Sequence, residues 1–242
     1  YVGFDAVQGA ELQGQMVLDY IKAHAAELDR NKDGIIGYVL AIGDIGHNDS
    51  IARTRGVRKA LGTGIEKDGK IISDPVGTNT DGSASVVQDG KLEVGGKSYT
   101  IRELASQEMK NTAGATWDAA TAGNAIAAWS SSFGDQIDVV VSNNDGMAMG
   151  AVEAMKAQGK VLPTFGVDAL PEALQMIKAD TLAGSVLNDG ETQAKAVYAL
   201  AVDLAAGKDP AASSAYKLDA NRNIRVPYVG VDKTNLDQFL KQ

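Results

Sequence analysis

The stretch IDVVVSNNDGMAMGAVEAMKAQGKVLPTFGVD, residues 137–168, decides the fold. Its first seven residues are a short, Val-rich apolar run, which is typical of a strand buried on both faces. A helical spacing of apolar residues follows over 147–157, and a second apolar run follows over 162–168. Strands that alternate with helices in this way form a parallel sheet with right-handed crossovers. The stretch therefore predicts the α/β class.

The same alternation extends in both directions along the chain. Further strands are predicted at GYVLAIG (37–43) and LAGSVLN (182–188). Further helices are predicted over residues 8–28, 50–61, 118–131 and 171–178. Together these elements predict a lobe of three αβα layers, in which helices cover both faces of one parallel sheet.

Residues 63–112 interrupt this rhythm. The segment contains GIEKDGK, DPVGTNTDGS and VQDGKLEVGGKSY, which are all rich in turn-forming residues. We interpret it as an inserted surface element, with a hairpin near 89–101 and a short helix near IRELASQEMK (101–110).

One short sequence is nearly repeated, as YVGFD at 1–5 and as YVGVD at 228–232. The repeat fits two interpretations. Apolar strands often end on an Asp that caps the next element. Alternatively, the two copies are a matched pair of strands that cross between two parts of the protein.

Composition excludes several classes of function. The chain has 242 residues, 44% of them hydrophobic, which is enough for a sizeable core. A formal charge of -8 argues against nucleic acid or an anionic membrane surface as a partner, because both require a basic face. The chain has no Cys, which removes disulfides, thiol catalysis and Cys-ligated zinc.

Polar side chains follow each predicted strand at its carboxyl end, where open parallel sheets bind their ligands. A single Asn or Asp in such a place is often only a helix N-cap. Several together, with an Arg and a Trp, are poorly explained by capping alone. The candidate site residues are His47, Asp49, Arg53, Trp117, Asn144, Asp168 and Asn188.

These residue types suit a sugar. Carboxylate and amide oxygens accept hydroxyl protons, Arg and His donate to sugar oxygens, and an indole can cover the C–H face of a pyranose. Catalysis fits less well, because a glycosidase needs a protonated carboxyl group, whereas Asp49 beside Arg53 is expected to stay ionised. No nucleophile-elbow or nucleotide-binding motif is found. We expect binding without catalysis.

The stretch DRNKDGII, residues 29–36, reads like the first half of an EF-hand loop. Asp29, Asn31 and Asp33 would offer side-chain oxygens, and Ile35 would offer its backbone carbonyl. The twelfth position of the loop is Leu40 rather than Glu, so a bidentate carboxylate would have to come from elsewhere. The alternative is a plain turn between a helix and a strand.

Several motifs resemble the type I periplasmic solute-binding family of glucose/galactose-binding proteins. They are GHNDSIARTR, TWDAA, SNNDGMAMGAVEA, FGVDALPEAL, LAGSVLND and RVPYVGVDKTNL, which together span nearly the whole chain outside 63–112. The resemblance implies an exported protein that binds D-glucose or D-galactose between two lobes. It also implies delivery of the sugar to an ABC permease and, in some bacteria, to a chemoreceptor. The seven candidate site residues fall on the family's sugar contacts.

The resemblance also bears on calcium. It places the family's ligands on Asp29, Asn31, Asp33 and Ile35, with Asp138 as the remote carboxylate. Gly37 stands where the family uses a side-chain oxygen, and Asp138 is shorter than the carboxylate it replaces. We therefore expect Ca²⁺ binding to be weakened or absent.

The resemblance divides the chain. Residues 1–188 with 228–242 correspond to the C-terminal lobe, with 63–112 as an insertion, and 189–227 would belong to the other lobe. Nothing corresponds to most of an N-terminal lobe, so we expect a further segment or a second chain to supply it. Without one, the apolar stripe Val197, Leu200, Ala201 and Leu204 would be exposed.

Two other interpretations remain open. The effector-binding core of a LacI-type regulator shares this fold, although neither a helix-turn-helix nor a basic face is visible. An inactive single-lobe fragment is the other.

Overall fold

The computed structural model describes residues 1–67, 70–71 and 87–240. They form an α/β fold around a seven-stranded sheet with the order β11-β9-β8-β7-β2-β6-β5. Its strands are β2 (Ile35–Ile42), β5 (Gly90–Val94), β6 (Lys97–Glu108), β7 (Ile137–Ser142), β8 (Thr164–Phe165), β9 (Gly184–Leu187) and β11 (Val229–Asp232). The five central strands are parallel, and the two edge strands, β5 and β11, are antiparallel to their neighbours. The predicted class and parallel sheet are confirmed.

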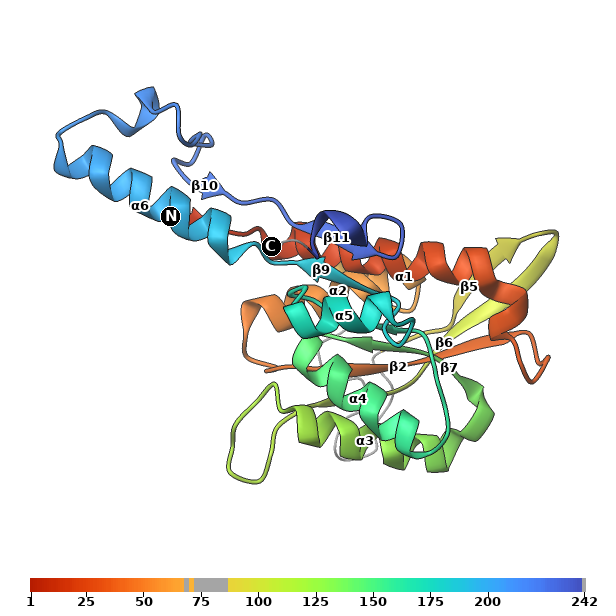
Figure 1. Ribbon diagram of the computed structural model, residues 1–242. Coiled ribbons are helices and arrows are strands. Elements are labelled where there is room, and N and C mark those ends of the chain that lie inside the picture. Colours follow the sequence, from red (N-terminus) through yellow and green to blue (C-terminus); the bar gives the residue numbers. More distant parts are fainter. Residues whose placement is uncertain (68–69, 72–86, 241–242) are drawn as a thin grey trace.

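Helices cover both faces of the sheet (Figure 1). The helices α1 (Ala6–Leu28) and α2 (Asn48–Leu61) pack on the face of β2 that carries Tyr38 and Leu40. The opposite face, which carries Val39, is covered by α3 (Ala119–Phe133), α4 (Asp145–Ala157) and α5 (Pro171–Lys178). Since successive side chains of a strand point to opposite faces, β2 fills the core on both sides. No helix in the described part of the chain is both long and apolar enough to span a membrane.

The helix predicted near residues 101–110 is wrong. Residues 101–108 belong to β6, which pairs parallel with β2 in the middle layer. The pattern of burial has period two, with Tyr99, Ile101 and Glu103 all buried, and this is the signature of a strand. The predicted hairpin near 89–101 is confirmed as β5 and β6, joined by a turn at Gly95 and Gly96 with positive φ.

The insertion predicted at 63–112 therefore cannot be a surface element throughout, because its second half supplies a central strand. The first half contains the short antiparallel pair β3 (Glu66–Lys67) and β4 (Lys70–Ile71). Residues 68–69 and 72–86 lie outside the described residues.

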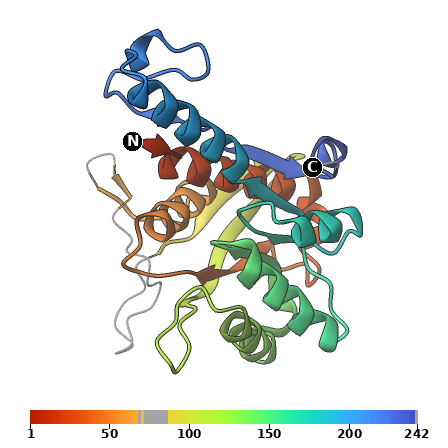
Figure 2. The same cartoon turned by 60° about the vertical axis from the view of Figure 1, so that its left-hand side comes forward.

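A second, two-stranded parallel sheet joins β1 (Val2–Gly3) to β10 (Ile224–Arg225). It packs with α6 (Gly190–Ala205), which extends away from the seven-stranded sheet in both views (Figures 1 and 2). Val197 and Leu204 are exposed, as the predicted stripe requires, whereas Leu200 is half-buried against the small sheet. The two copies of the repeat lie in different sheets, β1 and β11, with the rings of Phe4 and Tyr228 5.0 Å apart. Short 3-10 helices lie at Gly134–Gln136, Pro210–Ala212 and Leu236–Gln238.

A buried ion pair fastens α2 to β6. The Nε of Arg58 donates to Glu103 Oε2 at 2.8 Å, and its Nη2 donates to Glu103 Oε1 at 2.6 Å. Both side chains are almost fully buried. The hydroxyl of Tyr38 on β2 also donates to Glu103 Oε2, at 2.7 Å, and burial raises its pKa well above the usual value. The network ties one helix to two neighbouring strands.

We predict that Glu103→Gln destabilises the fold by about 3–5 kcal/mol, because Arg58 is left buried without a counter-charge. The double variant Arg58→Met/Glu103→Leu should be more stable than either single variant, since both charges are then removed from the core. Urea unfolding followed by circular dichroism measures these differences. A Glu103→Gln variant within 1 kcal/mol of the wild type would contradict this account of the network.

Candidate functional site

The candidate site lies at the carboxyl ends of β2, β6 and β7. From β2 the chain crosses to β6 on one side and then returns past β2 to β7 on the other. Such a switch point opens a crevice beyond the strand ends, in which ligands of open α/β sheets bind. The predicted residues follow these strands and the next ones along the sheet, β8 and β9.

Arg53 is central to this cluster. It lies on α2 and is only 4% exposed. Its Nη1 donates to the carbonyl of Asn143 at 2.7 Å, and its Nη2 is 3.7 Å from Asp49 Oδ2. Its guanidinium carbon lies 5.9 Å from the ring centroid of Trp117, in cation–π geometry. The side chain thus connects the loops that follow β2, β6 and β7.

The position of Trp117 is fixed by its backbone conformation and by packing on β2. Its backbone has φ of +60°, which is uncommon for a large residue, and its indole packs on Gly43 at the end of β2. The ring of His47 meets it edge-on, with centroids 5.6 Å apart. His47 is also the N-cap of α2, because its Nδ1 accepts from the backbone N–H of Asp49 at 3.2 Å. With Nδ1 accepting, the other ring nitrogen of neutral His47 carries the proton and is a donor.

The two asparagines after β7 play different roles. Asn143 is fully buried, and its Oδ1 accepts from Gly43 N, Ser50 Oγ and Thr54 Oγ1 at 3.1, 2.9 and 3.3 Å. Asn144 caps α4 by accepting from Met147 N at 2.9 Å. The capping oxygen is occupied, so Asn144 has its amide N–H groups left to offer a ligand.

Asp168 and Asn188, which follow β8 and β9, complete the cluster. Burial raises the pKa of Asp168, while the charge of Arg53 and a hydrogen bond from Asn188 oppose the rise and Asp49 adds to it. Asp168 has φ of +121°, an unusual backbone conformation of the kind that gathers at functional sites. The Oδ1 of Asn188 is buried and accepts no hydrogen bond within the described part of the chain. A buried acceptor needs a donor, and a ligand hydroxyl can supply one.

Asp145 supports this side of the site from beneath. Its carboxylate accepts from Ser185 Oγ at 2.7 Å and from Leu170 N at 2.8 Å, and so fixes the loop that presents Asp168. Burial raises the pKa of Asp145 to about 7, against the opposing effect of both hydrogen bonds.

Interactions link six of the seven predicted residues into one cluster, and Asn144 adjoins it through Asn143, whose carbonyl accepts from Arg53. Sequence reasoning missed two neighbours of this cluster. Gln13 on α1 is 1% exposed, and its Nε2 donates to the carbonyls of Ser142 at 2.7 Å and Gly166 at 3.3 Å. It ties together the ends of β7 and β8. Tyr228 is also buried, which raises its pKa, and the adjacent Arg53 opposes the rise. A Gln between Leu12 and Met16, on the apolar side of a helix, is a signal that could have been noticed.

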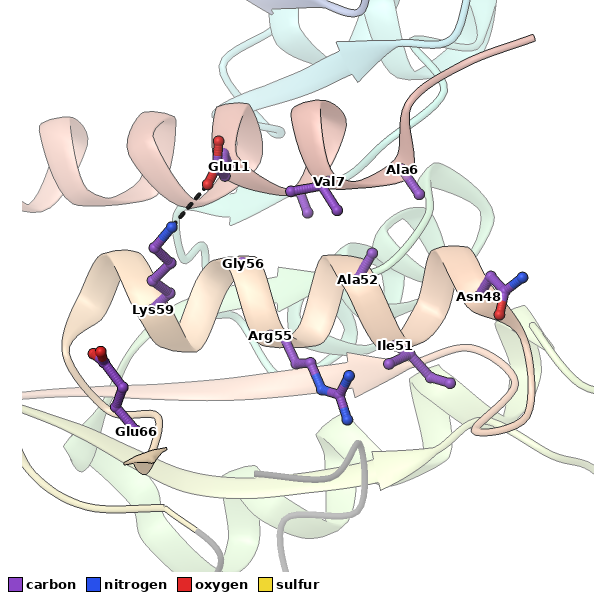
Figure 3. A pocket seen from close by; sticks show the side chains of 11 residues that line it. Ala6, Val7, Glu11, Asn48, Ile51, Ala52, Arg55, Gly56, Lys59 and Glu66 are labelled. Atoms are coloured by element: carbon purple, nitrogen blue, oxygen red, sulfur yellow. Dashed lines mark hydrogen bonds and ion pairs between the residues drawn. The ribbon is translucent and has the colours of Figure 1, made fainter. Parts of the chain in front are cut away.

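A separate groove of about 500 Å³ runs between α1 and α2 (Figure 3). Glu11 and Lys59 bridge it at one end, with 2.8 Å between their charged atoms. None of the seven predicted residues lines this groove. Its lining residues are Ala6, Val7, Ala10, Glu11, Asn48, Ile51, Ala52, Arg55, Gly56, Lys59 and Glu66.

The predicted calcium loop joins α1 to β2, with Lys32 and Gly34 at positive φ as its sharp turn requires. Within residues 1–67, 70–71 and 87–240, no three His, Cys, Asp or Glu side chains converge as a metal site would require. Asp29, Asn31 and Asp33 instead accept hydrogen bonds from backbone N–H groups of their own loop.

Residues 1–209 match the periplasmic binding protein domain family, and the chain belongs to this family. The D-galactose/methyl-galactoside binding periplasmic protein MglB of Haemophilus influenzae is 42% identical over 243 residues, which cover all of this chain and 61% of that protein. A xylitol-binding protein of Mycolicibacterium smegmatis is 36% identical over 107 residues, covering 44% of this chain and 31% of that protein. The chain thus spans about three fifths of the length of MglB.

Solved structures show the same fold. An ABC transporter solute-binding protein from Bacillus halodurans, with bound myo-inositol, superposes with a TM-score of 0.64 at 24% identity. The match covers 99% of this chain and 62% of that one. A second such protein, from Actinobacillus succinogenes with bound D-allose, gives 0.65 at 17% identity over 99% of this chain and 64% of that one.

We predict that Gly43→Ala displaces Trp117. A Cβ at residue 43 would lie 2.4 Å from the indole, closer than any real contact, so the ring must move. Near-UV circular dichroism and tryptophan emission should both change. Gly46→Ala, in the same loop, is the matched control, because its Cβ would meet only Asp44 Oδ1 at 3.3 Å. Identical spectra for Gly43→Ala and the wild type would contradict the packing of Trp117 on Gly43.

Proposed function

We propose that this chain binds a hexose, D-glucose or D-galactose, as the solute-binding component of a bacterial ABC sugar transporter, and leaves the sugar chemically unchanged. Its setting would be the periplasm or an equivalent extracytoplasmic space. The observation that carries the proposal is the cluster of six polar and aromatic residues at the switch point of the sheet, with Asn144 adjoining it. Family membership and the similarity to MglB support it.

Each residue type has a role toward a pyranose. Asp49, Asp168 and the free oxygen of Asn188 accept from sugar hydroxyls. Arg53, His47 and Asn144 donate to sugar oxygens, and the indole of Trp117 covers an apolar ring face. Asp49 lies 3.7 Å from Arg53, so a donor and an acceptor stand side by side, as suits the binding of a hydroxyl-rich ligand.

A second lobe would close on the sugar, supplied by a further segment of the same protein or by another chain. The two-stranded sheet of β1 and β10 is too small to be stable alone, and α6 exposes Val197, Tyr198, Val202 and Leu204. An added lobe would extend this sheet and cover the helix. The closed form would then be presented to an ABC permease and, in some bacteria, to a chemoreceptor.

The first test is a titration of the chain with D-glucose and D-galactose, followed by tryptophan fluorescence, with myo-inositol and ribitol as comparisons. We expect saturable quenching by the hexoses, carried by Trp117. A Trp129→Phe variant, whose substituted residue lies on α3 and packs against the core on that face of the sheet, should keep the response. Trp117→Ala should lose it and bind roughly tenfold more weakly or worse, a change of about 1.4 kcal/mol.

The responses to myo-inositol and ribitol decide between the alternative functions. A response to myo-inositol or ribitol without one to hexoses would overturn the hexose assignment but keep polyol binding. If no ligand changes the tryptophan fluorescence up to millimolar concentration, the chain is an inactive single lobe.

Sugar affinity should fall on acidification. The ionised Asp168 is the better acceptor, and its raised pKa means that affinity is lost at a higher pH than for an ordinary Asp. We expect the dissociation constant to rise as pH falls from 8 to 4, by roughly 10- to 100-fold for the loss of a charged hydrogen bond. Asp168→Asn should bind weakly throughout and show a flat profile. A slope that persists in this variant would assign the titration to Asp49 or Asp145 instead.

A further inference from the structure

We propose that the guanidinium of Arg30 takes the place of a calcium ion in the loop between α1 and β2, so that this loop holds its conformation without a metal. The inference concerns a region remote from the sugar site and does not depend on the proposed function. It rests on four features of the loop and its neighbour, the start of β7.

The remote carboxylate already faces a cation, the guanidinium of Arg30. Asp138 is almost fully buried, and its Oδ2 accepts from the backbone N–H of Gly37 at 2.9 Å. Its Oδ1 is buried and accepts no hydrogen bond within the described residues, but it lies 3.3 Å from Nη2 of Arg30 as an ion pair. A metal that used this carboxylate in bidentate fashion would have to displace Arg30 from Oδ1.

The cation also holds the backbone of β7. Nη2 of Arg30 donates to the carbonyl of Ile137 at 2.5 Å. A guanidinium is permanently charged and presents several donors in one plane, so it can serve a carboxylate and a carbonyl together. Calcium would take the same two ligand types, carboxylate and carbonyl oxygen. The guanidinium of Arg30 therefore already contacts the two kinds of oxygen that calcium would bind here.

The ninth position of the loop cannot carry a ligand. A Cβ on Gly37 would lie 2.2 Å from the carbonyl oxygen of Gln136, so no side chain fits there. The close approach comes with an irregular register: Gly37 pairs with Ile137, whereas Tyr38 pairs with Val139. Asp138 is the extra residue, and its side chain turns toward Gly37 N.

The remaining candidate ligands are used within the loop. Asp29 accepts from Gly34 N at 3.3 Å, and Asp33 accepts from Ile35 N at 2.8 Å. Asn31 accepts from Asp33 N at 3.3 Å and donates to Asp33 Oδ2 at 2.9 Å. These hydrogen bonds hold the turn by itself, and Gly37 and Leu40 supply no side-chain oxygen at the ninth and twelfth positions, so the donor set falls short of a seven-coordinate calcium site.

The decisive measurement is the unfolding equilibrium of the chain in EGTA and then in 1 mM Ca²⁺, at pH 8. This pH is above the pKa of Asp138, which burial raises to about 7 against the Gly37 N–H and Arg30. We expect Ca²⁺ to change the unfolding constant by less than about twofold, whereas a micromolar site would change it roughly 1,000-fold. Terbium luminescence should likewise show no saturable site. A tenfold or larger stabilisation by Ca²⁺ would overturn the proposal.

The variant Arg30→Gln tests the cation itself. Its matched control is Arg225→Gln, because Arg225 also donates to a carbonyl, that of Phe4 at 3.0 Å, and pairs with Asp219 at 3.6 Å with similar exposure. We expect Arg30→Gln to raise the unfolding constant at least about tenfold more than the control, since it leaves Asp138 buried without a counter-charge. Asp138→Asn added to Arg30→Gln should recover part of the loss. Equal effects of the two Arg→Gln variants would overturn the role given to Arg30, and if Arg30→Gln does not fold, the calcium titration of the wild type decides alone.

Discussion

The structure depends on how α2 is fastened across the middle of the sheet. The helix carries two buried arginines, and each one binds a strand that flanks β2. Arg58 reaches Glu103 on β6, and Arg53 reaches the carbonyl of Asn143 at the end of β7. Charged groups are costly to bury unless they are paired. The helix must therefore lie where both arginines reach their partners. The same fastening places the residues that start α2 over the switch point.

Close packing of α1 on α2 makes this arrangement possible. A Cβ on Gly56 would meet Ala10 at 2.6 Å, and one on Gly14 would meet the carbonyl of Gly56 at 2.6 Å. The absence of side chains at these two positions lets the helices touch backbone to backbone. Gln13, beside this contact, can then reach over the ends of β7 and β8. Packing and the site geometry are therefore set by the same few residues.

Apolar runs and helical spacing were sufficient to predict most of the fold, because β2, β7 and the helices that flank them bury uniform apolar faces. They failed at β6, where IRELASQEMK reads as a helix. One of its charged residues, Glu103, is buried only because Arg58 and Tyr38, distant in the sequence, pair with it. The cluster at the strand ends was predictable once a parallel sheet was predicted, because the carboxyl ends of all parallel strands meet at one edge of the sheet. Gln13 and Tyr228 fall outside that rule, since neither follows the carboxyl end of a parallel strand; Gln13 was signalled only by its place on the apolar side of a helix.

The two loops at opposite ends of β7 are linked by the register of that strand. Side chains alternate between the faces of a strand, so a shift by one residue would exchange every side chain of β7 between them. The irregularity at Asp138 sets this register against β2, and Arg30 and Gly37 hold it there. Five residues later, the same register turns Asn143 into the core, with Asn144 next to it at the start of α4. The conformation of the loop after α1 is thus a condition for the geometry of the site at the other end of the sheet, whether a metal or a guanidinium holds it.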